Sequence, residues 1–249
     1  MDPLRAYWDF GDLDASEARF RALRAEALTQ LARVEGMRER FDEGDRLLDE
    51  AAQERDERVG IRIDLERGRL RRSSGDKEAA LPLFESAFAA AVQAGEDWLA
   101  ADAAHMCALA APDRDGFVAW TERGLELAAR SEAAAYWESA LLNNLGWELF
   151  DAGDHEEALA AFERALAARE REPERRAEIA IARYCVGKAL LALDRPEEAA
   201  AQLERGIEQA PEPDHYLQEE LAEAYRALGR EEDARQHAEL SARLRGSPG

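Results

Sequence analysis

The chain has 249 residues, of which 46% are hydrophobic, 35% charged and 7% aromatic. That length accommodates one or two domains with a buried core. The 54 acidic residues outnumber the 33 basic ones and give a net charge of −21. Such a charge argues against binding nucleic-acid phosphates or an anionic membrane surface, so we expect neither partner. Ala, Leu, Arg and Glu dominate the composition and β-branched residues are scarce, which favours an all-α fold.

Residues 1–14 precede the first predicted helix and carry Tyr7, Trp8 and Phe10. This segment lacks the basic start and apolar run of a signal peptide. Asp14 is predicted to cap the first helix, with Glu17 reaching back to the cap. Two interpretations of the aromatic residues stay open. They cover the outer face of the first helix pair, or they form an arm that binds a partner or a second copy of the chain.

The remainder is predicted to be helical, because apolar residues recur at helical spacing and turn residues separate the runs. No run approaches the ~20 apolar residues that a membrane-spanning helix needs. We expect twelve helices, at 15–38, 41–54, 57–73, 77–94, 97–110, 115–130, 132–151, 155–170, 174–193, 196–209, 214–228 and 231–245.

The clearest helix pair covers residues 142–165. Gly153 ends its first helix, and Phe162 lies on the apolar stripe of its second helix. Gly146 is small, so we expect the two helices to cross closely there, with alanine tolerated better than a large residue. The apolar stripe of the first helix consists of Leu142, Leu145 and Leu149.

The same pattern recurs along the chain at intervals of 35 to 41 residues. The positions equivalent to Gly146 are Ala32, Gly68, His105, Gly187 and Ala222. The repeated pattern resembles the signature of the tetratricopeptide repeat family. That signature is a Leu-Gly pair, a large residue, then a small residue, an aromatic residue and a further Ala. Two intervals of 41 residues exceed that family's 34 by seven, which is two helical turns and keeps each stripe on its face. The resemblance implies a right-handed α-solenoid of about six antiparallel helix pairs.

We expect the solenoid to span residues 15–245, with an aromatic cap segment at 1–14 and a frayed tail at 246–249. The last pair has Ala238 where an aromatic residue is expected, as suits a terminal repeat without a further neighbour. The repeats are expected near 15–54, 57–94, 97–130, 132–170, 174–209 and 214–245.

No set of residues suggests catalysis, metal binding or a cofactor. The four histidines are scattered over different repeats, and none belongs to a metal-ligand motif. The two cysteines, Cys107 and Cys185, have no metal-ligand spacing and are expected to be buried apolar residues. A chain of this kind is expected in the cytoplasm, and an enzyme is the third choice of function.

The resemblance implies that the first helix of each pair lines a concave groove. On the fourth pair, Asn143, Trp147 and Phe150 lie off the core stripe at helical spacing, with Asn144 beside them. Tyr184 and Lys188 occupy the matching face of the fifth pair, and Tyr216 occupies that of the last pair. We interpret these residues as an aromatic floor with amides that grip a peptide backbone. The alternative is that the aromatic rings simply pack between neighbouring helices.

The second pair carries a stripe of arginines that includes Arg62 and Arg69. Glu66 lies four residues after the first and three before the second, so the stripe either neutralises itself or forms a basic patch for an acidic ligand. The leading expectation is a scaffold or adaptor that binds a protein or peptide segment in the groove. The alternative is an intracellular peptide-sensing regulatory protein. A homodimer through the terminal repeats is a further expectation.

Overall fold

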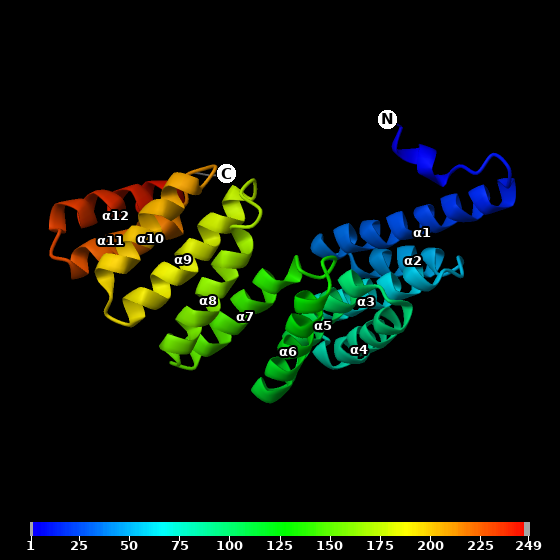
Figure 1. Cartoon of the computed structure of the whole chain (residues 1–249), viewed down its shortest axis with the longest axis horizontal. Coiled ribbons are helices and arrows are strands. Elements are labelled where there is room, and N and C mark those ends of the chain that lie inside the picture. The colour runs from blue at the N-terminus through cyan, green and yellow to red at the C-terminus, as the bar shows by residue number, and fades with distance from the viewer. Residues whose placement is uncertain (1, 247–249) are drawn as a thin grey trace. The chain divides into compact units, whose positions relative to one another are not determined.

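A computed structural model describes residues 2–246 of the chain. Within that range it contains one short 3-10 helix, η1 (Pro3–Tyr7), twelve α-helices and no strand (Figure 1). The all-α prediction is therefore confirmed. The α-helices are α1 (Leu13–Met37), α2 (Phe41–Ala51), α3 (Glu57–Ser73), α4 (Lys77–Ala94), α5 (Asp97–Ala110), α6 (Arg114–Arg130), α7 (Trp137–Asp151), α8 (His155–Arg169), α9 (Arg176–Ala192), α10 (Pro196–Gln209), α11 (His215–Ala227) and α12 (Glu231–Gly246).

Every helix bound falls within three residues of its predicted position except the start of α7, which was predicted at residue 132. Residues 132–136 instead form hydrogen-bonded turns. The Ala134 amide donates to the Ser131 carbonyl, and the Trp137 amide donates to the Ala134 carbonyl. These three-residue bonds are too tight for an α-helix, so the regular helix begins only at Trp137.

The chain divides into two compact units, with unit 1 ending at Trp137 and unit 2 beginning at Glu138. In unit 1, α1 packs on α2 and α3, and the contacts continue in order from α3 to α6. In unit 2, α8 to α12 pack in the same consecutive order, and α9 also contacts α11. Each unit is thus a stack of helix pairs of the α-solenoid class.

The expected helix crossings are confirmed at the small residues. A Cβ added to Gly146 would lie 2.5 Å from Cδ1 of Phe162, and one added to Gly187 would lie 2.6 Å from Cγ of Leu203. Phe162 and Leu203 are both buried. Even alanine at Gly146 would require the buried Phe162 ring to shift, because the ring leaves no room for a methyl group.

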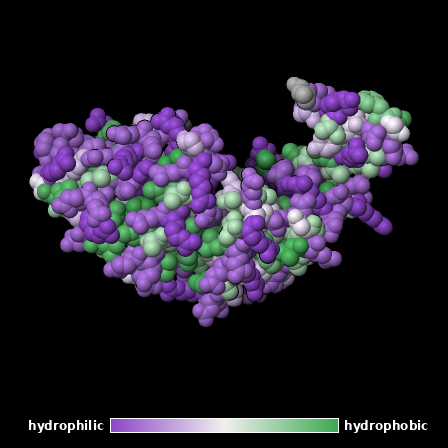
Figure 2. All heavy atoms as spheres, viewed as in Figure 1, coloured by the Kyte–Doolittle hydropathy of each residue, from purple (hydrophilic) through white to green (hydrophobic). Residues whose placement is uncertain are grey.

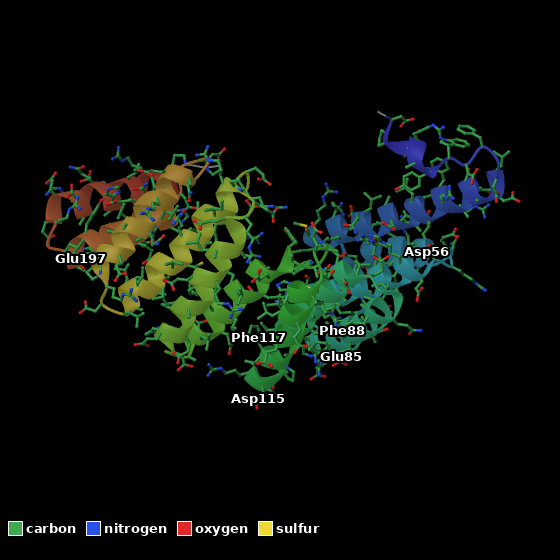
Figure 3. The ribbon with its side chains drawn as sticks, in the orientation of Figure 1. Asp56, Glu85, Phe88, Asp115, Phe117 and Glu197 are labelled. Carbon is green, nitrogen blue, oxygen red and sulfur yellow. The ribbon has the colours of Figure 1, made fainter. Side chains whose placement is uncertain are left out.

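Turns and caps set the helix ends. Gly153 ends the turn after α7 with a φ of +87°, a left-handed conformation that glycine adopts without strain. Asp56, labelled in Figure 3, precedes α3 and accepts a hydrogen bond from the Val59 amide at 3.0 Å. The predicted cap of α1 is wrong: Asp12, two residues before Asp14, accepts from the Ala15 amide. Glu17 pairs with Arg21 one turn along the helix rather than reaching back.

The N-terminal segment packs its aromatic rings on α1. The Tyr7 and Trp8 rings lie 5.8 and 5.2 Å from the Phe20 ring, and Phe10 stacks on Trp8. Trp8 is 43% exposed and Phe10 is 69% exposed. The segment therefore covers part of α1 and still presents aromatic surface. At the other end, Gly246 is the last residue of α12, and the rest of the predicted tail lies outside the described residues.

Candidate functional site

Three aromatic side chains form a row across the first helices of unit 2. Trp147 of α7, Tyr184 of α9 and Tyr216 of α11 are the members of this aromatic row. Ring centroids are 6.4 Å apart between Trp147 and Tyr184, and 6.2 Å apart between Tyr184 and Tyr216. Trp147 and Tyr184 are half-buried, and Tyr216 is 55% exposed. Aromatic surface therefore continues from one repeat to the next.

A pocket of about 330 Å³ lies between α9 and α11. Its walls are mainly apolar, with one carboxylate at the start of α11. That carboxylate, Asp214, accepts hydrogen bonds from the amides of Tyr216 and Leu217 and so caps the helix. The lining residues are Ile181, Tyr184, Asp214, Tyr216 and Leu217.

A second pocket of about 190 Å³ lies between α7 and α9 and is more polar. Asn143 and Asn144 line it from α7, while Arg169 and Glu178 contribute charged groups. Ile181 belongs to both pockets and is 55% exposed, so it joins them into one surface. We call this combined surface, with the aromatic row, the inner face of unit 2.

Five of the six predicted site residues of unit 2 lie on or beside this face: Asn143, Asn144 and Tyr184 line its pockets, Trp147 belongs to the aromatic row, and Lys188 lies beside Tyr184. Asn143, Asn144, Trp147, Tyr184 and Lys188 are all half-buried, as is Phe150. Trp147 meets Phe150 at 5.6 Å and the core residue Phe162 at 5.2 Å between ring centroids. The Trp147 ring is therefore partly exposed on the inner face and partly packed against the core. Each of the two interpretations of the aromatic residues accounts for one of these contacts.

Charges on the inner face are paired within the protein. Lys188 Nζ lies 2.5 Å from Glu220 Oε1 of α11 and 5.9 Å from the centre of the Tyr184 ring. Burial raises the pKa of Tyr184, so its hydroxyl stays protonated and able to donate at neutral pH. Asn143 Oδ1 accepts a weak bond from Cys185 Sγ at 3.4 Å. The charge of Lys188 is therefore compensated by Glu220 within the protein.

Two arginines of the stripe in unit 1, Arg62 and Arg69, face carboxylates of neighbouring helices. Arg69 Nη1 lies 2.7 Å from Glu66 Oε1, and its Nη2 lies 2.5 Å from Asp102 Oδ1. Arg62 Nε lies 3.5 Å from Glu26 Oε2 on α1. The interpretation of Arg62 and Arg69 as an open basic patch is wrong, because carboxylates of α1, α3 and α5 form ion pairs with these two arginines.

Burial disfavours the charged forms of one histidine and of both cysteines. Burial lowers the pKa of His105 to about 4 and raises the pKa of both Cys107 and Cys185 to about 12. Both thiols are buried, and neither forms a disulfide. Across residues 2–246, no group of three or more His, Cys, Asp or Glu side chains is placed to hold a metal ion. None of the helices described is both long and apolar enough to cross a membrane.

Sequence reasoning missed the residue that links the two pockets. Ile181 lies three residues before Tyr184 and seven before Lys188, so helical spacing places all three on one face. An isoleucine on the same helix face as Tyr184 and Lys188 was the signal available in the sequence. Asp214 was missed because it precedes α11 and acts through the helix end rather than through a helical stripe.

Comparisons with known proteins identify the repeat type. The family model described as Tetratricopeptide repeat matches residues 143–212 and 186–248. No curated protein sequence matches the chain. Among solved structures, BtubC (BKLC) from P. vanneervenii is 16% identical with a TM-score of 0.61 over 93% of this chain and 94% of that one.

Two further solved structures share the fold. The apo form of RapI is 12% identical with a TM-score of 0.73, over 96% of this chain and 68% of that one. NprR in complex with its cognate peptide NprX is 16% identical with a TM-score of 0.55, over 87% of this chain and 66% of that one. At these identities the likeness concerns the fold alone.

Proposed function

We propose that this chain, whose residues 143–248 match the tetratricopeptide repeat model, is a scaffold or adaptor that binds an extended peptide segment of a partner protein on the inner face of unit 2. The observation that carries the proposal is the continuous surface formed by the aromatic row and the two pockets joined at Ile181. An aliphatic or aromatic side chain of the peptide enters the pocket between α9 and α11. The amides of Asn143 and Asn144 pair with the peptide backbone in the pocket between α7 and α9.

Charge favours a basic partner. The net charge of the chain is −21, and Asp214 and Glu178 line the two pockets. A peptide with Lys or Arg beside its apolar anchor therefore approaches faster and is selected over an acidic one. On the face drawn in Figure 2, hydrophilic side chains cover most of the surface and hydrophobic ones form smaller patches. An apolar anchor is therefore expected to find few competing sites.

The test is a peptide-display selection on the full chain, followed by fluorescence anisotropy with the selected peptides. Ile181→Asp should weaken binding at least tenfold, because it removes the apolar contact that joins the two pockets and leaves a carboxylate that the peptide's apolar anchor would have to desolvate. Ile181 is exposed, so the fold should not change. Val92→Asp is the matched control: Val92 is a β-branched residue of α4, 45% exposed and outside both pockets. Equal weakening by both variants, or none by Ile181→Asp, would contradict the proposal.

Trp147→Ala is a less selective variant. Its ring contacts the core residue Phe162, so its removal should lower the free energy of unfolding as well as binding. Removing the exposed Tyr216 ring, by Tyr216→Ala, separates these effects and should weaken binding while leaving the melting temperature unchanged. A stable Tyr216→Ala variant that binds as the wild type does would remove the aromatic row from the proposal.

Peptide sensing is the second candidate function. The observation in its favour is the shared fold with NprR, which was solved with its cognate peptide. Small-angle X-ray scattering distinguishes the two: a sensor changes its radius of gyration on binding, whereas a scaffold keeps it. We propose no enzymatic activity. The cytoplasm is the proposed compartment, since both cysteines are free thiols in buried positions.

A further inference from the structure

Exposed apolar side chains gather at the N-terminal end of unit 1. Of the eleven large hydrophobic residues that are exposed within residues 2–246, seven belong to the first 37 residues. Four of them precede or begin α1, and three lie in its last two turns. Single exposed apolar residues are normal on a protein surface, but several on one element mark a contact surface. The seven are Leu4, Trp8, Phe10, Leu13, Leu31, Val34 and Met37.

Helical spacing places an apolar stripe on the solvent side of α1. Its members follow one another at intervals of four, four and three residues and therefore share one face. They are Leu23, which is half-buried, and the exposed residues Ala27, Leu31 and Val34. Ala32, which α1 buries in the core of unit 1, lies on the opposite side of the helix. We call these four residues the outer stripe of α1.

The N-terminal segment covers only the beginning of this side of α1. In Figure 1 the segment folds over α1 on the side away from α2, and its rings pack on Phe20. The helix from Leu23 to Met37 stays open, with Leu31 52% and Val34 39% exposed. The outer face of a terminal repeat is normally polar, because no further repeat covers it. An apolar stripe at this position therefore calls for another helix.

Charge indicates that this other helix is a second copy of α1. The helix carries four acidic and four basic residues, so its net charge is zero in a chain whose net charge is −21. A strongly basic or acidic partner gains little from a neutral helix, whereas two copies of α1 meet without like-charge repulsion between them. The charged residues are Asp14, Glu17, Arg19, Arg21, Arg24, Glu26, Arg33 and Glu35.

The order of residues along the outer stripe is complementary to itself in the antiparallel direction. A twofold axis midway between Leu23 and Val34 brings each of these residues opposite the other in the second copy. The same axis brings the small Ala27 opposite the large Leu31. A small residue facing a large one lets the side chains of two packed helices interdigitate. The stripe therefore fits a second copy of itself.

Charges beside the stripe match in the same arrangement. Arg24 follows Leu23 by one residue and Glu35 follows Val34 by one, so both lie on the same flank of the stripe. In an antiparallel pair these flanks meet, and Arg24 of each copy comes opposite Glu35 of the other. Arg24 already pairs with Glu50, and its side chain is mostly exposed, so the new contact extends an existing ion pair. A parallel pair would instead bring like charges to the same level.

We propose that the outer stripe of α1 is a dimer interface that packs antiparallel on the outer stripe of a second copy of the chain. The N-terminal segment on Phe20 sets the register, because the α1 helix of the second copy ends at Met37 at about this level. Met37 is 82% exposed, and in the dimer it lies beside the N-terminal rings of the other copy, a contact that sulfur and aromatic rings favour. This interface lies in unit 1 and the peptide surface in unit 2, so either proposal can fail alone.

Sedimentation equilibrium of the full chain tests the interface. We expect a dimer whose fraction rises with concentration. Leu31→Glu places a carboxylate in the apolar stripe and should raise the dissociation constant of the dimer about tenfold or more without lowering the melting temperature, because Leu31 is exposed. Val92→Glu is the matched control, since Val92 is 45% exposed on α4 of the same unit and outside the stripe.

Two outcomes of this experiment overturn the proposal. A wild-type chain that stays monomeric up to about 1 mM would exclude a second copy and leave the stripe to a helix of another protein. Equal weakening by Leu31→Glu and Val92→Glu would show that the effect comes from added charge and not from the stripe.

A second pair of variants tests the flanking charges. Arg24→Glu places a carboxylate opposite Glu35 of the other copy and should weaken the dimer about tenfold. Arg46→Glu is the control, because Arg46 is a similarly exposed arginine of α2 that also lies near Glu50, at 3.8 Å. Equal dissociation constants for the two variants would contradict the antiparallel arrangement.

Cysteine crosslinking measures the direction of the two helices. In the antiparallel pair the two copies of Gln30 lie about 5 Å apart along the helix axis, whereas the two copies of Met37 lie about 25 Å apart. A short bismaleimide should therefore join two copies of Gln30→Cys and fail to join two copies of Met37→Cys. The native Cys107 and Cys185 are buried and should not react. Crosslinking of Met37→Cys, or none of Gln30→Cys, would overturn the proposal.

Discussion

Two glycines of the same helix allow the energetic cost of overpacking the crossing of α3 and α4 to be measured with an internal control. Gly60 and Gly68 both lie in α3. A Cβ added at Gly60 has no neighbouring atom within 4 Å, whereas one added at Gly68 would lie 2.5 Å from Cε1 and 2.7 Å from Cδ1 of Phe84. Phe84 is fully buried, so its ring has nowhere to move.

The expected energies follow from two opposing effects. Alanine is favoured over glycine inside a helix by up to ~1 kcal/mol, and this gain applies at both positions. Overpacking at Gly68 costs about 1–3 kcal/mol of stability, whereas alanine at Gly60 causes no overpacking. Gly60→Ala should therefore stabilise unit 1, and Gly68→Ala should be less stable than Gly60→Ala by about 1–3 kcal/mol.

Urea unfolding followed by circular dichroism measures the difference. In a Phe84→Leu background the cost of Gly68→Ala should shrink, because the smaller side chain relieves the contact. If Gly68→Ala stabilises the protein as much as Gly60→Ala does, the crossing of α3 and α4 is not packed as described.

Three further predictions concern single side chains. His105 has a pKa of about 4 in the folded state against 6.5 when exposed, so the unfolded chain binds an extra proton between these values. The free energy of unfolding should fall as pH drops from 6.5 to 4, by about 3 kcal/mol in total, and His105→Gln should flatten this slope in urea titrations. Cys107 and Cys185 should resist iodoacetamide in the native protein and react once it is unfolded in urea, because burial raises both thiol pKa values to about 12. If the exposed N-terminal rings support a homodimer, Phe10→Asp should shift the mass measured by light scattering from dimer to monomer; a monomeric wild type would refute that role.

The sequence predicted the helices because their signals are local. Apolar spacing, aspartates before helices and glycines after them act within a few residues, and eleven of twelve helix starts fell within three residues of their observed positions. The start of α7 was wrong because the turns at 132–136 contain good helix formers, and only their hydrogen bonds show that the helix begins at Trp137.

The candidate site was predictable only in part. Periodicity placed Tyr184 and Lys188 on one helix face and Tyr216 on the matching face of the last pair, but it did not show that a pocket lies between Tyr184 and Tyr216. How far α11 is shifted against α9 depends on packing between repeats and has no local signal. Likewise, Glu66 was foreseen as a neighbour of Arg69, whereas Asp102 meets Arg69 only because α3 and α5 lie side by side.

The central claim is that a peptide binds the inner face of unit 2, and photo-crosslinking tests it most directly. A selected peptide carries benzoylphenylalanine in place of its apolar anchor, and mass spectrometry maps the attachment after irradiation. We expect attachment at Ile181, Tyr184, Tyr216 or Leu217, which line the pocket between α9 and α11, and loss of the crosslink in Ile181→Asp. Attachment to α8, α10 or α12, or to any helix of unit 1, would contradict it.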